Sequence, residues 1–186
     1  MADAARDIPR MGATEYLRME RQSPCRHEFV DGLVYAMAGG SRRHNDITND
    51  VFGSALAKLA PPCLPYARDV TVPIENAHKE QYYHPDVLVT CSDLDDDDDL
   101  IRLPSLIVEV LSRSTEDADR GCKFDDDRKL PSLQEYVLVH QERPCVEIYR
   151  RRTNWEKEVN ELDAGITLES VDVTQPVAAF NLRVTF

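Results

Sequence analysis

The segment Leu106–Leu111 constrains the fold of this chain more than any other, because Glu109 interrupts an otherwise continuous apolar run. A short apolar run of this kind is typical of a strand that is buried on both faces of a sheet. A buried carboxylate without a partner is costly, so Glu109 must be paired, protonated or bound to a metal ion. The segment therefore predicts a central strand that carries one acidic side chain.

The composition predicts one globular domain. The chain has 186 residues, of which 42% are hydrophobic and 30% charged, and this fits a single core. Residues 1–12 contain glycine, proline and mixed charge and predict a flexible N-terminal arm, which leaves residues 13–186 as the domain. No stretch approaches the roughly 18 apolar residues of a membrane span, and the polar N-terminus lacks a secretory signal. We therefore expect no membrane partner.

The cysteines are scattered, odd in number and never arranged as a CxxC pair. This pattern argues against a disulfide framework or a zinc ribbon and favours free thiols in a reducing cytoplasm. The five are Cys25, Cys63, Cys91, Cys122 and Cys145.

Helical and strand-like patterns are mixed along the chain. Asp31-Gly32 between two short apolar runs predicts a hairpin with strands over 27–30 and 33–37. Apolar residues recur at helical spacing in 43–59, and Pro61-Pro62 ends that helix. We expect further helices over 14–21 and 117–129, and strands over 66–72, 83–90, 106–111, 135–139, 146–151, 155–161 and 182–184. Such a set predicts a mixed α/β sheet with few helices.

The net charge of −12 gives no support to a nucleic-acid partner. Six acidic residues lie in one loop, Asp93 and Asp95–Asp99, where consecutive like charges usually stay solvated. Residues 113–152 contain nine basic and nine acidic residues, so this part leaves a nucleic-acid partner open. The basic triplet Arg150–Arg152 is either a solubilising cluster or a contact to a nucleic-acid backbone.

A second acid, Asp86, stands in another strand-like run, Tyr82–Val89. Alternate side chains share one face of a strand, so acids on neighbouring strands can point at one spot. Two close carboxylates repel each other unless a cation compensates them. Mg²⁺ prefers hard oxygen ligands and keeps waters that a phosphate can replace. Asp86 and Glu109 therefore predict a site for Mg²⁺ (or Mn²⁺), the alternative being buried acids satisfied by an arginine or by backbone donors.

Several blocks, in the same order, resemble the Uma2 (DUF820) family of predicted endonucleases over about residues 13–152. The resemblance implies the restriction-endonuclease-like fold of the PD-(D/E)XK superfamily, a mixed central β-sheet flanked by helices. It also implies metal-dependent hydrolysis of DNA. The blocks that carry it are His27–Gly39, Arg43–Ile47, Tyr83–Val87, Ile107–Thr115, Asp119–Phe124 and Leu133–Val139.

In this resemblance, Asp86 matches the first acid of the superfamily's motif and Glu109 the second. The usual lysine lies two positions after the second acid, where this chain has Leu111. Lys123 matches a lysine that the family shows further on, and a helix could bring its ammonium back to the acids. The implied catalytic residues are Asp86, Glu109 and Lys123, the alternative for Lys123 being a surface position.

Two further residues match the family. Glu28 matches an acid that similar folds place beside the metal, so we expect it as a third metal ligand. His44 matches a histidine at the start of the first long helix, and we expect it as an accessory residue that contacts metal-bound water or phosphate. The alternatives are a salt-bridged Glu28 and a core or capping His44.

Two hypotheses follow for the function. The first is a metal-dependent endonuclease acting on DNA, for which a homodimer would supply two active sites and cut both strands. The second is a nuclease-fold protein that has lost cleavage and acts as a binding or dimeric interaction module, as Leu111 and the net charge suggest. A glycosidase with paired carboxylates is disfavoured, because no aromatic-rich sugar platform accompanies the acids.

Overall fold

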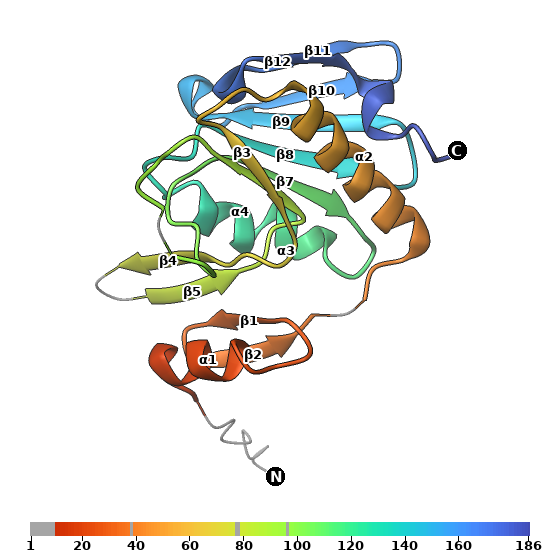
Figure 1. The fold of residues 1–186 in the computed structure, drawn as a ribbon. Helices are drawn as coiled ribbons and strands as arrows, with labels where there is room; N and C mark the ends of the chain where they lie inside the picture. Colours follow the sequence, from red (N-terminus) through yellow and green to blue (C-terminus); the bar gives the residue numbers. More distant parts are fainter. Residues whose placement is uncertain (1–9, 38, 77–78, 96) are drawn as a thin grey trace.

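The computed structural model describes residues 10–37, 39–76, 79–95 and 97–186, and a six-stranded sheet lies at its centre (Figure 1). The sheet consists of β3 (Leu64–Ala67), β6 (Val87–Thr90), β7 (Pro104–Leu111), β8 (Glu135–His140), β9 (Cys145–Arg150) and β10 (Lys157–Glu161). Their spatial order is β10-β9-β8-β7-β6-β3. Strands β7 and β8 are parallel, whereas the other neighbours are antiparallel. The sheet is therefore mixed, as the sequence predicts.

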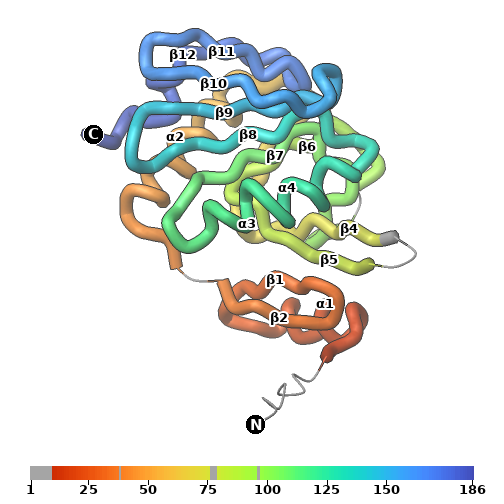
Figure 2. Tube along the Cα trace, turned by 180° about the vertical axis from the view of Figure 1, so that it is seen from behind, coloured from red at the N-terminus to blue at the C-terminus, as the bar shows by residue number. Residues whose placement is uncertain are grey.

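Helices cover both faces of this sheet. Helix α2 (Arg42–Lys58) lies on one face, and α3 (Glu116–Arg120) and α4 (Cys122–Asp127) lie on the other, as Figures 1 and 2 show from opposite sides. The hydroxyl of Ser41 caps α2 by accepting a hydrogen bond from the backbone N–H of His44 at 3.1 Å. Because successive strand residues face opposite layers, Val108 packs in the core beneath α2 while Ile107 packs in the core beneath α4.

A smaller sheet forms the N-terminal part of the molecule. Its strands are β1 (His27–Val30), β2 (Leu33–Ala36), β4 (Val72–Asn76) and β5 (Lys79–Tyr83), in the order β2-β1-β5-β4. Asp31 and Gly32 form the β1–β2 turn with φ values of 47° and 93°, which a two-residue hairpin of the right twist requires. The predicted hairpin is thus confirmed. Helix α1 (Ala13–Glu20) packs on it through an aromatic cluster of Tyr16, Phe29 and Tyr82.

Two predicted strands were wrong. In each case the structure has two shorter strands that belong to different sheets. The predicted strand over 66–72 ends at Ala67, and the chain resumes as β4 at Val72. The predicted strand over 83–90 combines the end of β5 with β6, and the irregular residues between them include Pro85. Proline lacks the N–H that a ladder needs, which explains the interruption.

Further differences affect the C-terminal half. The predicted helix over 117–129 is two short helices that meet at Gly121. The predicted strand over 182–184 is absent, and the described tail there is irregular. Instead β11 (Gly165–Leu168) and β12 (Val173–Pro176) form a hairpin. In both strands buried and exposed residues alternate, the period of two that is typical of a half-buried strand.

The expectation of free thiols fails at one pair of cysteines. Cys63 and Cys91 form a disulfide, with their Cα atoms 3.9 Å apart. Leu64 pairs with Thr90 in the β3–β6 ladder, so the two cysteines occupy the next opposite positions. The remaining three cysteines are free. Sequence spacing could not reveal this pair, because it depends on the strand register.

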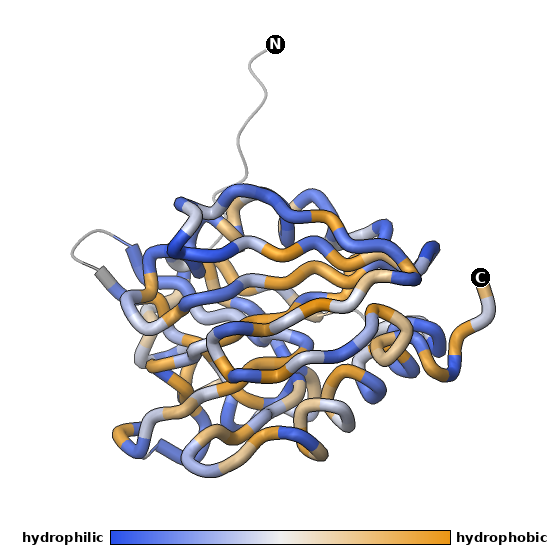
Figure 3. The backbone as a smooth tube through the Cα atoms, turned by 90° about the horizontal axis from the view of Figure 1, so that it is seen from above, coloured by the Kyte–Doolittle hydropathy of each residue, from blue (hydrophilic) through white to orange (hydrophobic). Residues whose placement is uncertain are grey.

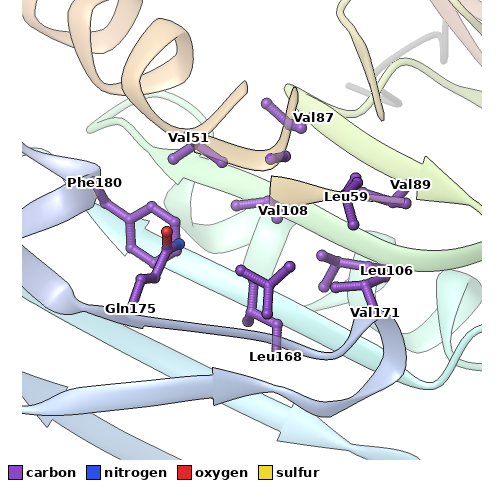
Figure 4. Close-up of a pocket in the computed structure, with 12 residues that line it drawn as sticks. Val51, Leu59, Val87, Val89, Leu106, Val108, Leu168, Val171, Gln175 and Phe180 are labelled. Carbon is purple, nitrogen blue, oxygen red and sulfur yellow. The ribbon is translucent and has the colours of Figure 1, made fainter. Parts of the chain in front are cut away.

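A small void lies in the interior on the α2 face. It is lined by Val51, Leu59, Val108, Phe180 and other mostly apolar residues (Figure 4). Its volume is about 10 Å³, hardly the space of one water. Figure 3 shows hydrophobic segments running along several of the neighbouring strands. No helix in the described ranges is long and apolar enough to cross a membrane.

Candidate active site

Asp86 and Glu109 face each other across the β6–β7 ladder. Val87 pairs with Val108 in antiparallel register, so the residue before β6 lies level with the residue that follows Val108. The backbone N–H of Asp86 donates to Glu109 Oε2 at 3.1 Å, and the backbone N–H of Val110 donates to Asp86 Oδ2 at 2.9 Å. These reciprocal bonds hold the two carboxylates together. Asp86 itself lies just before the strand, and not within it as the sequence pattern predicted.

Glu109 is the most deeply buried member of this pair, with 3% of its surface exposed. It lies on the face of β7 that α3 and α4 cover, the same face as Ile107 and Leu111. Burial raises its pKa well above the usual value, and the nearby carboxylates of Asp119 and Asp86 act in the same direction. The opposing charge of Lys123 only partly offsets this shift.

Lys123 supplies the cation that this buried acid needs. It lies in the first turn of α4, and its Nζ is 2.7 Å from Glu109 Oε1 and 3.0 Å from Glu28 Oε1. Asp119, one helical turn earlier, lies 4.0 Å away. Burial alone would lower the pKa of Lys123, but the three carboxylates outweigh it and raise that pKa well above its usual value. The structure thus places Lys123 at the acids, and not on the surface.

Glu28 reaches the site from the N-terminal sheet. Strand β1 pairs with β5 through Phe29 and Tyr82, which places the hairpin beside the segment that leads to Asp86. The carboxylate of Glu28 forms an ion pair with Lys123, and in the described part of the chain no hydrogen bond joins it to Asp86 or Glu109. Its role as a metal ligand stays a prediction. What the structure shows is that Glu28 belongs to the site through its ion pair with Lys123.

His44 reaches Asp86 from the start of α2. Its Nε2 lies 3.1 Å from Asp86 Oδ2, and its Nδ1 lies 3.4 Å from a terminal nitrogen of Arg68. A guanidinium can only donate, so Nδ1 must accept and the ring hydrogen must be on Nε2. His44 then donates to Asp86 Oδ2 and helps to fix the orientation of that carboxylate.

The donor set fits a magnesium ion held by few protein ligands. In the described part of the chain, no group of three or more His, Cys, Asp or Glu residues is arranged to hold a metal ion. Mg²⁺, however, is commonly bound by one or two carboxylates together with waters and substrate phosphates. Asp86 and Glu109 provide two adjacent carboxylates, and Asp86 Oδ1 accepts no hydrogen bond from any described residue.

Three residues at the site were missed by the sequence reasoning. Asp119 could have been found from its i, i+4 spacing to Lys123. Asn45 and Arg68 are the other two. The guanidinium of Arg68 donates to the side-chain oxygen of Asn45 and to His44, and His44 contacts Asp86. No motif pointed to Arg68, since it comes from the loop after β3.

Several other charged side chains form ion pairs with partners outside the Asp86–Glu109–Lys123 constellation. Arg120 pairs with Glu116 and with the buried Glu147. Of the basic triplet, Arg150 pairs with Glu135 and Arg152 with Glu169. In the acidic loop, carboxylates of Asp95 and Asp97 accept backbone hydrogen bonds within that loop.

Comparisons with known proteins identify the family of this chain and confirm its fold. The Uma2 family model, described as "Putative restriction endonuclease", matches residues 13–183. Two uncharacterized proteins of Synechocystis are similar to this chain over 148 residues each. The protein slr1290 is 36% identical, and the match covers 77% of this chain and 76% of that protein. The protein sll1609 is 34% identical, and the match covers 75% of this chain and 80% of that protein. The crystal structure of a putative nuclease of DUF820 from Anabaena variabilis superposes with a TM-score of 0.75 over 92% of this chain and 98% of that one. At 14% identity that similarity shows the fold. The family match over most of the chain shows that this protein belongs to the Uma2 family.

Proposed function

We propose that the protein is a metal-dependent endonuclease that hydrolyses phosphodiester bonds in DNA. The observation that carries the proposal is the convergence of Asp86, Glu109 and Lys123, three residues from separate elements, on one spot. Membership of a family described as restriction endonucleases supports a nucleic-acid substrate.

Asp86 and Glu109 would hold the metal ion, Mg²⁺ or Mn²⁺, and Glu28 is the proposed third ligand. A divalent ion bound there would polarise the phosphodiester and lower the pKa of a bound water. His44 and the N–H of Val110 hold Oδ2 of Asp86, and Oδ1 is the oxygen that would bind the ion. The ammonium of Lys123 would stabilise the negative charge that develops on the phosphate oxygens during attack by water.

Nicking of a supercoiled plasmid tests this proposal. We expect nicking to require Mg²⁺ or Mn²⁺, to stop on addition of a chelator, and to fall by at least about 10²-fold in Asp86→Asn and Glu109→Gln. Glu142→Gln is the matched control, since Glu142 is an exposed acid in the turn after β8. Nicking that persists undiminished in both purified site variants would refute the proposal.

A second function is supported by Leu111, which occupies the position of the usual motif lysine and lies buried in the core. The protein would then be a nuclease fold without cleavage that binds a partner. Calorimetry with Mn²⁺ distinguishes the two: heat of binding that disappears in Asp86→Asn supports the enzyme, whereas no binding by the unaltered protein supports the interaction module.

A further inference from the structure

Arg68 stands next to Asp86 on the side away from Glu109. In the sheet, β6 lies between β7 and β3, and Ala67 of β3 pairs with Val87 of β6. Arg68 and Asp86, one residue beyond this pair on each strand, therefore lie at the same level. Glu109, Asp86 and Arg68 form a row across three neighbouring strands.

The backbone at Arg68 is in the left-handed region, with a φ of 59°. A residue with a Cβ is disfavoured there, and glycine would adopt this conformation more easily. Strained residues of this kind persist where the surrounding structure holds them, and they are common at functional sites. Arg68 is thus held at the end of β3 against its local preference.

The side chain of Arg68 is anchored by neutral partners. One terminal nitrogen donates to Asn45 Oδ1, and the other lies 3.4 Å from His44 Nδ1. A guanidinium has five N–H donors, so several remain available. Among the described residues, no carboxylate lies within ion-pair distance of Arg68, whereas Lys123 has three carboxylates around it.

This difference matters for an anionic ligand. Lys123 is surrounded by Glu28, Glu109 and Asp119, so its charge is already balanced within the site. Arg68 is half-buried and carries an unbalanced positive charge beside Asp86. Arginine is suited to bidentate binding of phosphate oxygens.

We propose that Arg68 binds a backbone phosphate of the nucleic acid that occupies the Asp86–Glu109 site. This inference rests on the proposed function and adds the residue that anchors the substrate. Asn45 and His44 hold the guanidinium in place, and its remaining N–H groups donate to the phosphate oxygens. Through the same contact, Arg68 determines which nitrogen of His44 donates to Asp86.

The test is the salt dependence of DNA binding, measured with a chelator present so that no cleavage occurs. Fluorescence anisotropy of a short fluorescein-labelled DNA duplex gives Kd over a series of KCl concentrations. For Arg68→Gly we expect Kd at low salt to rise roughly tenfold or more, and the slope of log K against log salt to shrink by about 0.9, the value for one phosphate contact. Arg68→Lys retains the charge and should recover most of the slope.

The variants separate binding from folding. Glycine suits the backbone at position 68, so the thermal midpoint of Arg68→Gly should not fall together with its affinity. The matched control is Arg18→Ala, because Arg18 is an exposed arginine on α1. Two outcomes overturn the role of Arg68 and leave the proposed function standing. In the first, Arg68→Gly has the same salt slope and affinity as the unaltered protein. In the second, Arg68→Gly and Arg18→Ala lose affinity equally. Absence of DNA binding by the unaltered protein overturns the role of Arg68, and the plasmid nicking assay with Mg²⁺ decides separately whether the proposed function stands.

Discussion

The ammonium of Lys123 lies 2.7 Å from Oε1 of Glu109, and both side chains are buried. The pair joins α4 to β7, so the cation reaches the acid from a helix and not from the strand. Gly121 makes this possible, because a Cβ at that position would lie 2.8 Å from the carbonyl oxygen of Asp117. The chain can therefore turn between α3 and α4 and place Lys123 over the strand.

Lys123→Met should abolish nicking and destabilise the fold. Removal of the ammonium leaves the buried carboxylate of Glu109 without its cation, and breaking a buried pair in this way costs about 3–5 kcal/mol. Urea denaturation followed by circular dichroism measures the free energy of unfolding, and the plasmid assay measures the activity.

Lys129→Met is the control for that variant. Lys129 follows α4, is half-exposed, and pairs with Asp126 at 2.7 Å. Asp126 is buried, but its carboxylate also accepts a hydrogen bond from the hydroxyl of Tyr83, and the ammonium of Lys129 is reached by solvent, so this variant should remain active and lose less stability than Lys123→Met. Equal free energies of unfolding and equal nicking activities of Lys123→Met and Lys129→Met would contradict the role of the buried Lys123–Glu109 pair in stability and activity.

Reduction of the Cys63–Cys91 disulfide should lower the free energy of unfolding. The bond closes a loop with a sequence separation of 28 residues, and a crosslink over a loop of this size is worth about 3.6 kcal/mol in the chain-entropy model. Denaturation curves with and without reductant measure the difference, and the double variant Cys63→Ser/Cys91→Ser should reproduce it.

A thiol titration of the unfolded protein checks the same bond. Three free thiols are expected without reductant, those of Cys25, Cys122 and Cys145, and five with it. Cys25→Ser should leave the denaturation curve unchanged. Five reactive thiols without reductant would contradict the pairing.

The backbone strain at position 68 can be measured by comparing two variants. Arg68→Gly and Arg68→Ala both remove the guanidinium and its contacts, so their difference reports only the backbone. With φ at 59°, the glycine variant should be more stable than the alanine variant by about 1 kcal/mol. Equal denaturation midpoints would show that the left-handed conformation is not maintained in solution.

The sequence predicted those features that depend on local chemistry. Asp31-Gly32 defined the hairpin because few other dipeptides adopt positive φ at both positions. The apolar run around Glu109 identified the central strand, and the family resemblance added Lys123. In the structure Lys123 lies at the acids that the resemblance implied.

Features that depend on register and on loops were not predictable in this way. The Cys63–Cys91 bond follows from the pairing of Leu64 with Thr90, which no local signal fixes. The role of Arg68 depends on a left-handed residue between two strands that the apolar pattern merged into one. The break at Gly121 was also missed, because the residues on both sides have helical character.

Asp127→Asn should stabilise the protein at alkaline pH. Asp127 is fully buried, neither carboxylate oxygen has a hydrogen-bond partner among the described residues, and burial raises its pKa from 3.8 to about 8. Between these two pH values the folded protein keeps a proton that the unfolded chain releases. The contribution of this group is therefore fully present below about pH 4 and is lost progressively as the pH rises to about 8, by up to roughly 1.4 kcal/mol per pH unit. An asparagine stays neutral, so the stability difference between Asp127→Asn and the unaltered protein should be small at pH 4 and should grow in favour of the variant up to pH 8. Urea denaturation at each pH measures it, with the exposed Asp125→Asn as the control that shows no such trend. A difference that is independent of pH would mean that Asp127 is ionised in the folded protein and has a partner, such as a bound water or cation.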